Sequence, residues 1–197
     1  MELLLNGKIY TRHIDDWKIS WESNGAYRHW CYQRKEGFDT NLLVVMFNPG
    51  SLSDEGKRLK SDTTLRILRE VCEPAKINPL IINLFDYSAP SPSMLFSNWE
   101  HRDADKLVYD RLESFEIAAY IMAYGNYEND DYDEQSINDD IKERIKLVSS
   151  KLSELKRIDL PLRSGGTPKH PMTWQIDKQK EEITNLLIAG INESPEN

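Results

Sequence analysis

The sequence lacks long apolar runs and has few cysteines. No stretch approaches the roughly 20 apolar residues that span a bilayer, and residues 1–13 lack a basic region followed by a cleavable apolar stretch. The two cysteines, Cys31 and Cys72, lie 41 residues apart and show no C-x-x-C or Cys/His ligand spacing. We therefore expect a soluble, cytoplasmic protein with reduced thiols, with no membrane contact and no zinc or redox module.

Motifs that bind cofactors are also missing. The chain contains no G-x-G-x-x-G, P-loop, G-x-S-x-G or H-E-x-x-H motif, so we expect neither a cofactor nor a metal. Hydrophobic residues nevertheless make up 39 % and aromatic residues 10 % of the 197 residues, which is enough for one folded core. We predict a single domain over residues 1–197 and a monomer.

The net charge of −8 is concentrated in one segment. Residues 128–143 hold eight acidic residues and one lysine, a local charge of −7, so the other 181 residues sum to about −1. We interpret residues 128–143 as a solvated acidic loop running into a helix, with metal binding as the alternative. The remaining charge therefore does not exclude a polyanionic partner such as DNA.

Apolar runs alternate with amphipathic stretches along the chain. Residues 1–40 combine short apolar pieces with an aromatic cluster and predict N-terminal strands. This alternation predicts an α/β fold of three layers, α/β/α, with a central four-stranded parallel sheet plus the added N-terminal strands. The predicted central strands are 42–47, 80–82, 117–124 and 158–162, and the predicted helices are 61–72, 100–116, 137–155 and 176–190.

Asparagine, glycine and histidine residues follow the predicted strands. Asn48 and Gly50 follow the first strand, Asn83 the second and Gly125 the third, while His170 lies in a Gly/Pro-rich loop after the fourth. Ligands bind beyond the carboxyl ends of parallel strands, so these positions predict a binding site. Structural alternatives are a turn at residues 48–50, a loop anchor at Asn83 and an ordinary surface histidine at His170.

Four motifs, taken in order, carry a family resemblance. They are Asn48-Pro49-Gly50, Asp62-Thr63-Thr64-Leu65-Arg66, Asn83-Leu84-Phe85 and Gly166-Thr167-Pro168-Lys169-His170-Pro171. This set resembles the uracil-DNA glycosylase superfamily and, within it, an uncharacterised domain-of-unknown-function family, over about residues 27 to 174. The resemblance implies a uracil-DNA glycosylase-like fold and a hydrolase that removes a base from DNA, the first step of base excision.

The resemblance also implies roles for the motif residues. Asn48 corresponds to the residue that positions the attacking water, and His170 to the histidine that hydrogen-bonds the departing base. Asn83 corresponds to the residue that reads the edge of the flipped base, and Phe85 and Gly50 belong to the same base site. Because the motifs carry no lysine except Lys169, a water-using, monofunctional glycosylase is expected rather than a lyase.

The implied DNA contacts lie outside the base site. Trp174 takes the place of the family's side chain that wedges into the base stack, next to Met172, which replaces a serine of the family motif. Met46 likewise replaces a glycine of the first motif. The expected phosphate contacts are Lys57, Arg58, Lys60, Arg163 and Lys169, and Asp62 and Arg66 have supporting roles, with a substrate contact as the alternative.

Gly50 suggests which base is removed. In uracil-specific members of the superfamily, a tyrosine at this position excludes pyrimidines that carry a substituent on C5, whereas Gly50 leaves that space open. We therefore predict a modified, 5-substituted pyrimidine, such as one in foreign or phage DNA, which would make the protein part of antiviral defence. Two alternatives remain, namely an N-glycosidase acting on free nucleosides or nucleotides and a non-catalytic module that binds modified DNA or nucleotides.

Overall fold

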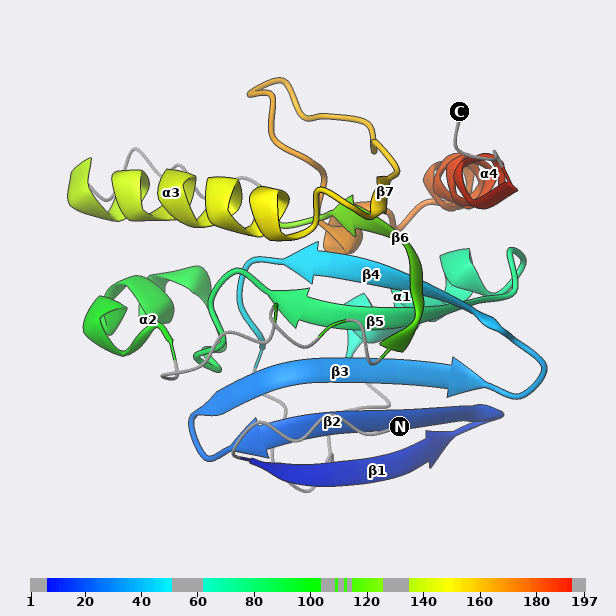
Figure 1. The fold of residues 1–197 in the computed structure, drawn as a ribbon, viewed down its shortest axis with the longest axis horizontal. Helices are drawn as coiled ribbons and strands as arrows, with labels where there is room; N and C mark the ends of the chain where they lie inside the picture. The colour runs from blue at the N-terminus through cyan, green and yellow to red at the C-terminus, as the bar shows by residue number, and fades with distance from the viewer. Residues whose placement is uncertain are drawn as a thin grey trace.

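The strands of the protein form one seven-stranded sheet in a computed structural model that describes residues 7–50, 62–103, 109, 112, 115–125 and 135–192. The strand order is β1-β2-β3-β5-β4-β6-β7, and Figure 1 shows the sheet with β1 at its lower edge. The strands are β1 (Lys8–Ile14), β2 (Trp17–Asn24), β3 (Tyr27–Lys35), β4 (Thr40–Met46), β5 (Ile77–Asn83), β6 (Ile117–Met122) and β7 (Lys156–Arg157).

The sheet is mixed, and the predicted fold class is therefore wrong. Antiparallel pairing joins β1, β2, β3 and β5, whereas parallel pairing joins β5, β4, β6 and β7. A separate central parallel sheet in an α/β/α sandwich is not formed, because β3 pairs directly with β5 and so brings the N-terminal strands into the same sheet. Helix and strand alternation does not reveal this, since it carries no information about which edge an N-terminal hairpin joins.

Helices cover both faces of the sheet. Helices α1 (Thr63–Cys72) and α4 (Asp177–Asn192) pack on one face, and α2 (Pro92–Phe96) and α3 (Gln135–Lys151) pack on the other. Figure 1 shows α2 and α3 on the left and α1 partly behind the sheet. Short 3₁₀ helices lie at Trp99–His101 and Pro171–Thr173. No helix in the described ranges is long and apolar enough to cross a membrane.

Most of the predicted elements are present near their expected positions. The helices predicted at 61–72, 137–155 and 176–190 correspond to α1, α3 and α4, and the first three central strands correspond to β4, β5 and β6. The strand predicted at 158–162 is wrong, because the strand that pairs with β6 is β7, which ends at Arg157, and Ile158 adds a single N–H hydrogen bond to the carbonyl oxygen of Tyr120. The helix predicted at 100–116 lies mostly outside the described residues.

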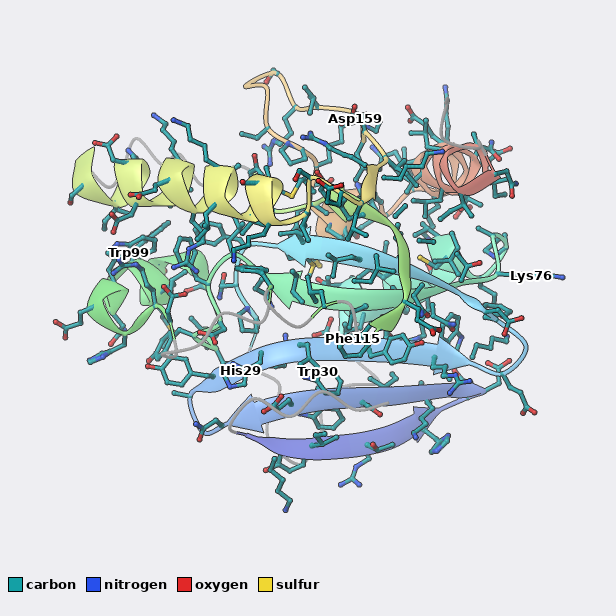
Figure 2. All side chains as sticks on the ribbon, viewed as in Figure 1. His29, Trp30, Lys76, Trp99, Phe115 and Asp159 are labelled. Atoms are coloured by element: carbon teal, nitrogen blue, oxygen red, sulfur yellow. The ribbon has the colours of Figure 1, made fainter. Side chains whose placement is uncertain are left out.

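A β-bulge near the start of β3 decides which way one charged side chain points. Glu22 pairs with Trp30, but the next residue of β2, Ser23, pairs with Arg28, so His29 is an extra residue in β3. Figure 2 shows His29 and Trp30 next to each other on this strand. Trp30 belongs to the core beneath α2 and α3. The extra residue reverses the alternation of side chains, and Arg28 therefore lies on the opposite face, the one covered by α1.

Both cysteines lie in the interior of the protein. Cys31 and Cys72 are free and buried, and burial raises the pKa of each thiol to about 12, so both stay protonated.

Residues 128–134 of the acidic segment lie outside the described residues, and the remainder of the segment forms the start of α3. Within that helix Asp140 accepts a hydrogen bond of 2.9 Å from Trp99 Nε1 and lies 3.1 Å from Arg102 Nη2.

Candidate functional site

A cavity of about 360 Å³ lies where the carboxyl ends of β4, β5 and β6 meet. Because β3 runs antiparallel to β5, the start of β3 reaches the same edge of the sheet. The walls come from Arg28 of β3, Asn48 and Gly50 after β4, Asp62, Thr64 and Leu65 of the first turn of α1, residues 89–91 after β5, Gly125 after β6, and Arg163, His170 and Met172 after β7. The cavity thus brings together segments that are separated by more than 100 residues.

Asn48 is held so that its amide oxygen remains available. Its Nδ2 donates to the carbonyl oxygens of Pro49 at 3.1 Å and Ala89 at 3.2 Å. Two carbonyl acceptors identify this atom as the nitrogen, so Oδ1 is the group that Asn48 can offer as a hydrogen-bond acceptor. The turn is tied to the following loop by Ala89 N–H donating to Pro49 and by Ser88 Oγ donating to Gly50. Asn48 is therefore fixed in the cavity wall.

His170 offers the cavity a hydrogen-bond donor, whereas Asn48 offers an acceptor. It caps the 3₁₀ helix Pro171–Thr173, and its Nδ1 accepts a hydrogen bond of 3.2 Å from Met172 N–H. Burial lowers the pKa of His170 to about 4, so the ring is neutral at pH 7. A neutral ring whose Nδ1 is an acceptor carries its proton on Nε2. His170 is therefore a neutral hydrogen-bond donor in the cavity wall.

The two residues predicted to enter the DNA stack have different environments. Trp174 is only 1 % exposed and belongs to the core between the sheet and helices α1 and α4. It does not present a free aromatic plate, because its ring already fills space in the core. Met172 is 41 % exposed and lines the cavity, so of the two predicted wedge residues it is the accessible one.

Only one of the three predicted base-binding residues lines the cavity. Gly50 lines the cavity, whereas Asn83 and Phe85 are not among the lining residues. Asn83 is 4 % exposed at the end of β5, and its Oδ1 is buried without a hydrogen-bond partner. Phe85 packs on the face covered by α2 and α3, with its ring 4.7 Å from that of Trp99, so it does not stack on a molecule in the cavity.

Part of the predicted phosphate-binding set lies beside the cavity. Lys57, Arg58 and Lys60 lie outside the described residues. Arg163 is exposed and lines the cavity, and Lys169 is half-buried in the same loop without lining it. Asp62 caps α1 by accepting from Leu65 N–H at 2.9 Å, and it also lines the cavity. Arg66 points elsewhere and pairs with Glu70 one turn along α1.

Sequence reasoning missed Arg28. Arg28 is 5 % exposed and lines the cavity, and within the described ranges its Nε and Nη1 have no hydrogen-bond partner. Burial lowers the pKa of the guanidinium, while the charge of Asp62 opposes that shift. The sequence does hold one indication that Arg28 is unusual, because this arginine stands among the aromatic residues of β3, a strand that is buried on both faces. The bulge that turns Arg28 toward the cavity has no comparable sequence signature.

The fold and the site define a mixed-sheet protein with a cavity at the carboxyl ends of its parallel strands. Residues 27–172, about three quarters of the chain, match a family described as "Protein of unknown function (DUF1643)", and the chain belongs to this family. The matched range includes every residue that lines the cavity. No curated protein matches the chain. Neither finding links it to the uracil-DNA glycosylase superfamily, so that resemblance stays a prediction.

Proposed function

We propose that the protein is a monofunctional DNA glycosylase that hydrolyses the N-glycosidic bond of a 5-substituted pyrimidine. The observation that carries the proposal is the pairing of Asn48 and His170 in one cavity, the first with a free acceptor oxygen and the second with a neutral N–H donor. Cleavage of this bond develops positive charge on the sugar and negative charge on the base. An acceptor that aims water and a donor that meets the base are therefore the two groups the reaction requires.

Each residue has a defined part in this reaction. The Oδ1 atom of Asn48 accepts a hydrogen bond from a water molecule and holds its oxygen toward the anomeric carbon. The Nε2–H group of His170 donates to a carbonyl oxygen of the base and stabilises the departing anion. As the water oxygen bonds to the anomeric carbon, the bond from that carbon to the base nitrogen breaks; the water proton passes to solvent, and the released base takes up a proton from solvent. No lysine is among the described residues that line the cavity, and both thiols are buried and protonated, which favours direct attack by water.

The lowered pKa of His170 predicts that the rate of base release decreases only at unusually low pH. Since burial lowers its pKa to about 4, we expect base release to stay constant from pH 8 to about pH 5 and to fall only near pH 4, where a proton on Nδ1 breaks the hydrogen bond from Met172 N–H that holds the ring in place. The unfolded chain takes up this proton near pH 6.5, so stability falls as the pH drops from about 6.5 toward 4. Single-turnover rates across this range, with His170→Gln as a donor that does not titrate, test the prediction. A decrease in the wild-type single-turnover rate near pH 6.5 would contradict it.

Gly50 offers a test of base selection. A Cβ atom built on Gly50 meets no atom of the described residues within 4 Å, so Gly50→Tyr introduces a side chain at the cavity wall where Gly50 leaves open space. We expect this variant to lose activity on 5-substituted pyrimidines by about 100-fold relative to uracil. The measurement compares release of 5-hydroxymethylcytosine and uracil, with Gly50→Ala as the matched control. Equal losses on both bases would show that Gly50 does not face C5.

The decisive experiment for the proposed function is base release from defined DNA. Purified protein is incubated with DNA containing uracil, mismatched thymine, 5-hydroxymethylcytosine or glucosylated 5-hydroxymethylcytosine, and abasic sites are detected by alkaline cleavage. Release of a 5-substituted base by the wild type, and not by Asn48→Ala, supports the proposal. Binding without any abasic site would favour the non-catalytic module instead.

A second candidate is an N-glycosidase that acts on free nucleotides. Two of the described arginines are already paired, Arg66 with Glu70 and Arg157 with Asp159 at 2.8 Å, which makes them less available to the phosphates of DNA. The cavity of about 360 Å³ is at the small end of ligand sites and suits one nucleotide. Release of free base from nucleotides, measured by chromatography in the absence of DNA, distinguishes this candidate.

A further inference from the structure

Arg28 is a buried charge with unused hydrogen-bond donors. It is 5 % exposed, and among the residues that the structure describes neither its Nε nor its Nη1 has a hydrogen-bond partner. Asp62 is the acidic residue whose charge acts on it, but Asp62 already accepts from Leu65 N–H as the cap of α1. A buried guanidinium with unused donors destabilises a fold unless an anion completes its hydrogen bonds. Arg28 therefore has the properties of a ligand-binding group rather than of a structural ion pair.

The first turn of α1 faces the same cavity and favours the same kind of ligand. Thr64 and Leu65 line the cavity together with Arg28. In a helix of ten residues, the N–H groups of Thr63 and Thr64 have no acceptor within the helix, and the side chain of Asp62 accepts from Leu65 N–H instead. The positive end of the helix dipole adds to the attraction for an anion. Arg163 brings a second cation to the wall, so the described lining residues keep one positive charge after Asp62 is counted.

Arg28 shares the cavity with the two residues of the proposed reaction but comes from a different strand. Arg28 belongs to β3 and Asn48 follows β4, and these two strands lie on either side of β5 in the sheet. Strands two apart are separated by roughly 10 Å. In the proposed function Asn48 serves the sugar and His170 the base. The Arg28 end of the cavity is then the position of the phosphate that the sugar carries.

We propose that the cavity binds the phosphate group of a nucleotide through the Nε and Nη1 donors of Arg28 and the first turn of α1. This inference rests on the proposed function and deepens it, because it states how the phosphate of the substrate is anchored. It concerns binding alone, and it predicts that a nucleoside, which lacks the phosphate, binds more weakly than the nucleotide. The phosphate belongs either to a free nucleotide or to the DNA backbone, and these two sources share the same chemistry.

Binding measurements on Arg28 variants test this proposal without requiring turnover. Titration calorimetry compares thymidine 5′-monophosphate, thymidine and a short single-stranded oligonucleotide with the wild type, Arg28→Met and Arg28→Lys. We expect Arg28→Met to weaken phosphate-containing ligands by about 10- to 100-fold, the range for lost hydrogen bonds to a charged group. Arg28→Lys keeps the positive charge but lacks the planar guanidinium group, so we expect its affinity to lie between those of the wild type and Arg28→Met. Arg66→Met, which removes an arginine outside the cavity, is the matched control.

Thermal unfolding separates a ligand-binding arginine from a structural one. Since Arg28 lacks partners, we expect the Tm of Arg28→Met to be at least that of the wild type without ligand, and the gain in Tm on adding the nucleotide to disappear. A lower Tm in both Arg28 variants would identify a structural residue and overturn the proposal. Equal binding of thymidine and its monophosphate would overturn it as well.

The outcomes also distinguish the phosphate source and leave the proposed function separately testable. Binding of the monophosphate but not the oligonucleotide assigns the site to free nucleotides, and the reverse assigns it to DNA, provided that Arg28→Met abolishes the difference. If neither ligand binds the wild type, the phosphate site is wrong. If Arg28-dependent binding is found but no base is ever released, the phosphate site stands and the glycosidic reaction fails.

Discussion

Asn48→Ala is expected to lower the rate of base release by about 10²- to 10³-fold, because the attacking water loses the group that orients it. Asn48 Oδ1 is the acceptor left over after Nδ2 has bonded to the carbonyl oxygens of Pro49 and Ala89. Substrate binding should change much less, since Arg28 and His170 remain in the wall. The measurement is the single-turnover rate of abasic-site formation together with the affinity for the same DNA.

The matched control for this prediction is Asn192→Ala. Asn192 is an exposed asparagine at the end of α4 and does not line the cavity. Circular dichroism on both variants checks that the loss of two hydrogen bonds at Asn48 has not unfolded the turn. A folded Asn48→Ala protein with the wild-type rate would remove Asn48 from the reaction.

Trp174→Ala is expected to reduce the free energy of unfolding by about 3–5 kcal/mol, which is the usual cost of deleting a fully buried tryptophan. Trp174 is 1 % exposed and is among the largest buried side chains of the described residues. It packs in the core that α1 and α4 form with the sheet. Denaturant unfolding monitored by circular dichroism measures the effect, which corresponds to a decrease in Tm of roughly 10 °C for a chain of this size.

Met172→Ala provides the comparison within the same loop. Met172 is 41 % exposed, so its truncation should change the free energy of unfolding by less than about 0.5 kcal/mol. If Trp174→Ala proved as stable as Met172→Ala, the tryptophan would not be the core residue that its burial indicates, and a wedge role would regain support.

Local sequence patterns predicted much of the architecture that surrounds the cavity. The apolar run at 42–47 and the turn after it correspond to β4 and the Asn48 corner, and the spacing of apolar residues at 137–155 corresponds to α3. The cavity lies beyond the ends of β4, β5 and β6, where ligand sites in parallel sheets are expected. These features depend on interactions between residues close in the chain, which a single sequence displays directly.

Three residues show where local pattern is insufficient. Phe85 follows the motif asparagine by two positions, yet it packs on the face away from the cavity. Trp174 stands at the expected distance from His170, yet it completes the core. Arg28 belongs to no motif, yet it lines the cavity. Each outcome depends on which distant segment covers the residue, and spacing along the chain does not report that.

The sequence by itself determined the local elements and the positions of the Asn48 turn and the His170 loop, because hydrophobic periodicity and the Pro and Gly residues act over a few neighbouring positions. Only the tertiary structure decided that the N-terminal strands join the sheet through β3 and β5, and that the bulge at His29 turns Arg28 toward the cavity. Strand pairing and register are set by contacts between segments about 50 residues apart, so they become visible only when the chain is folded.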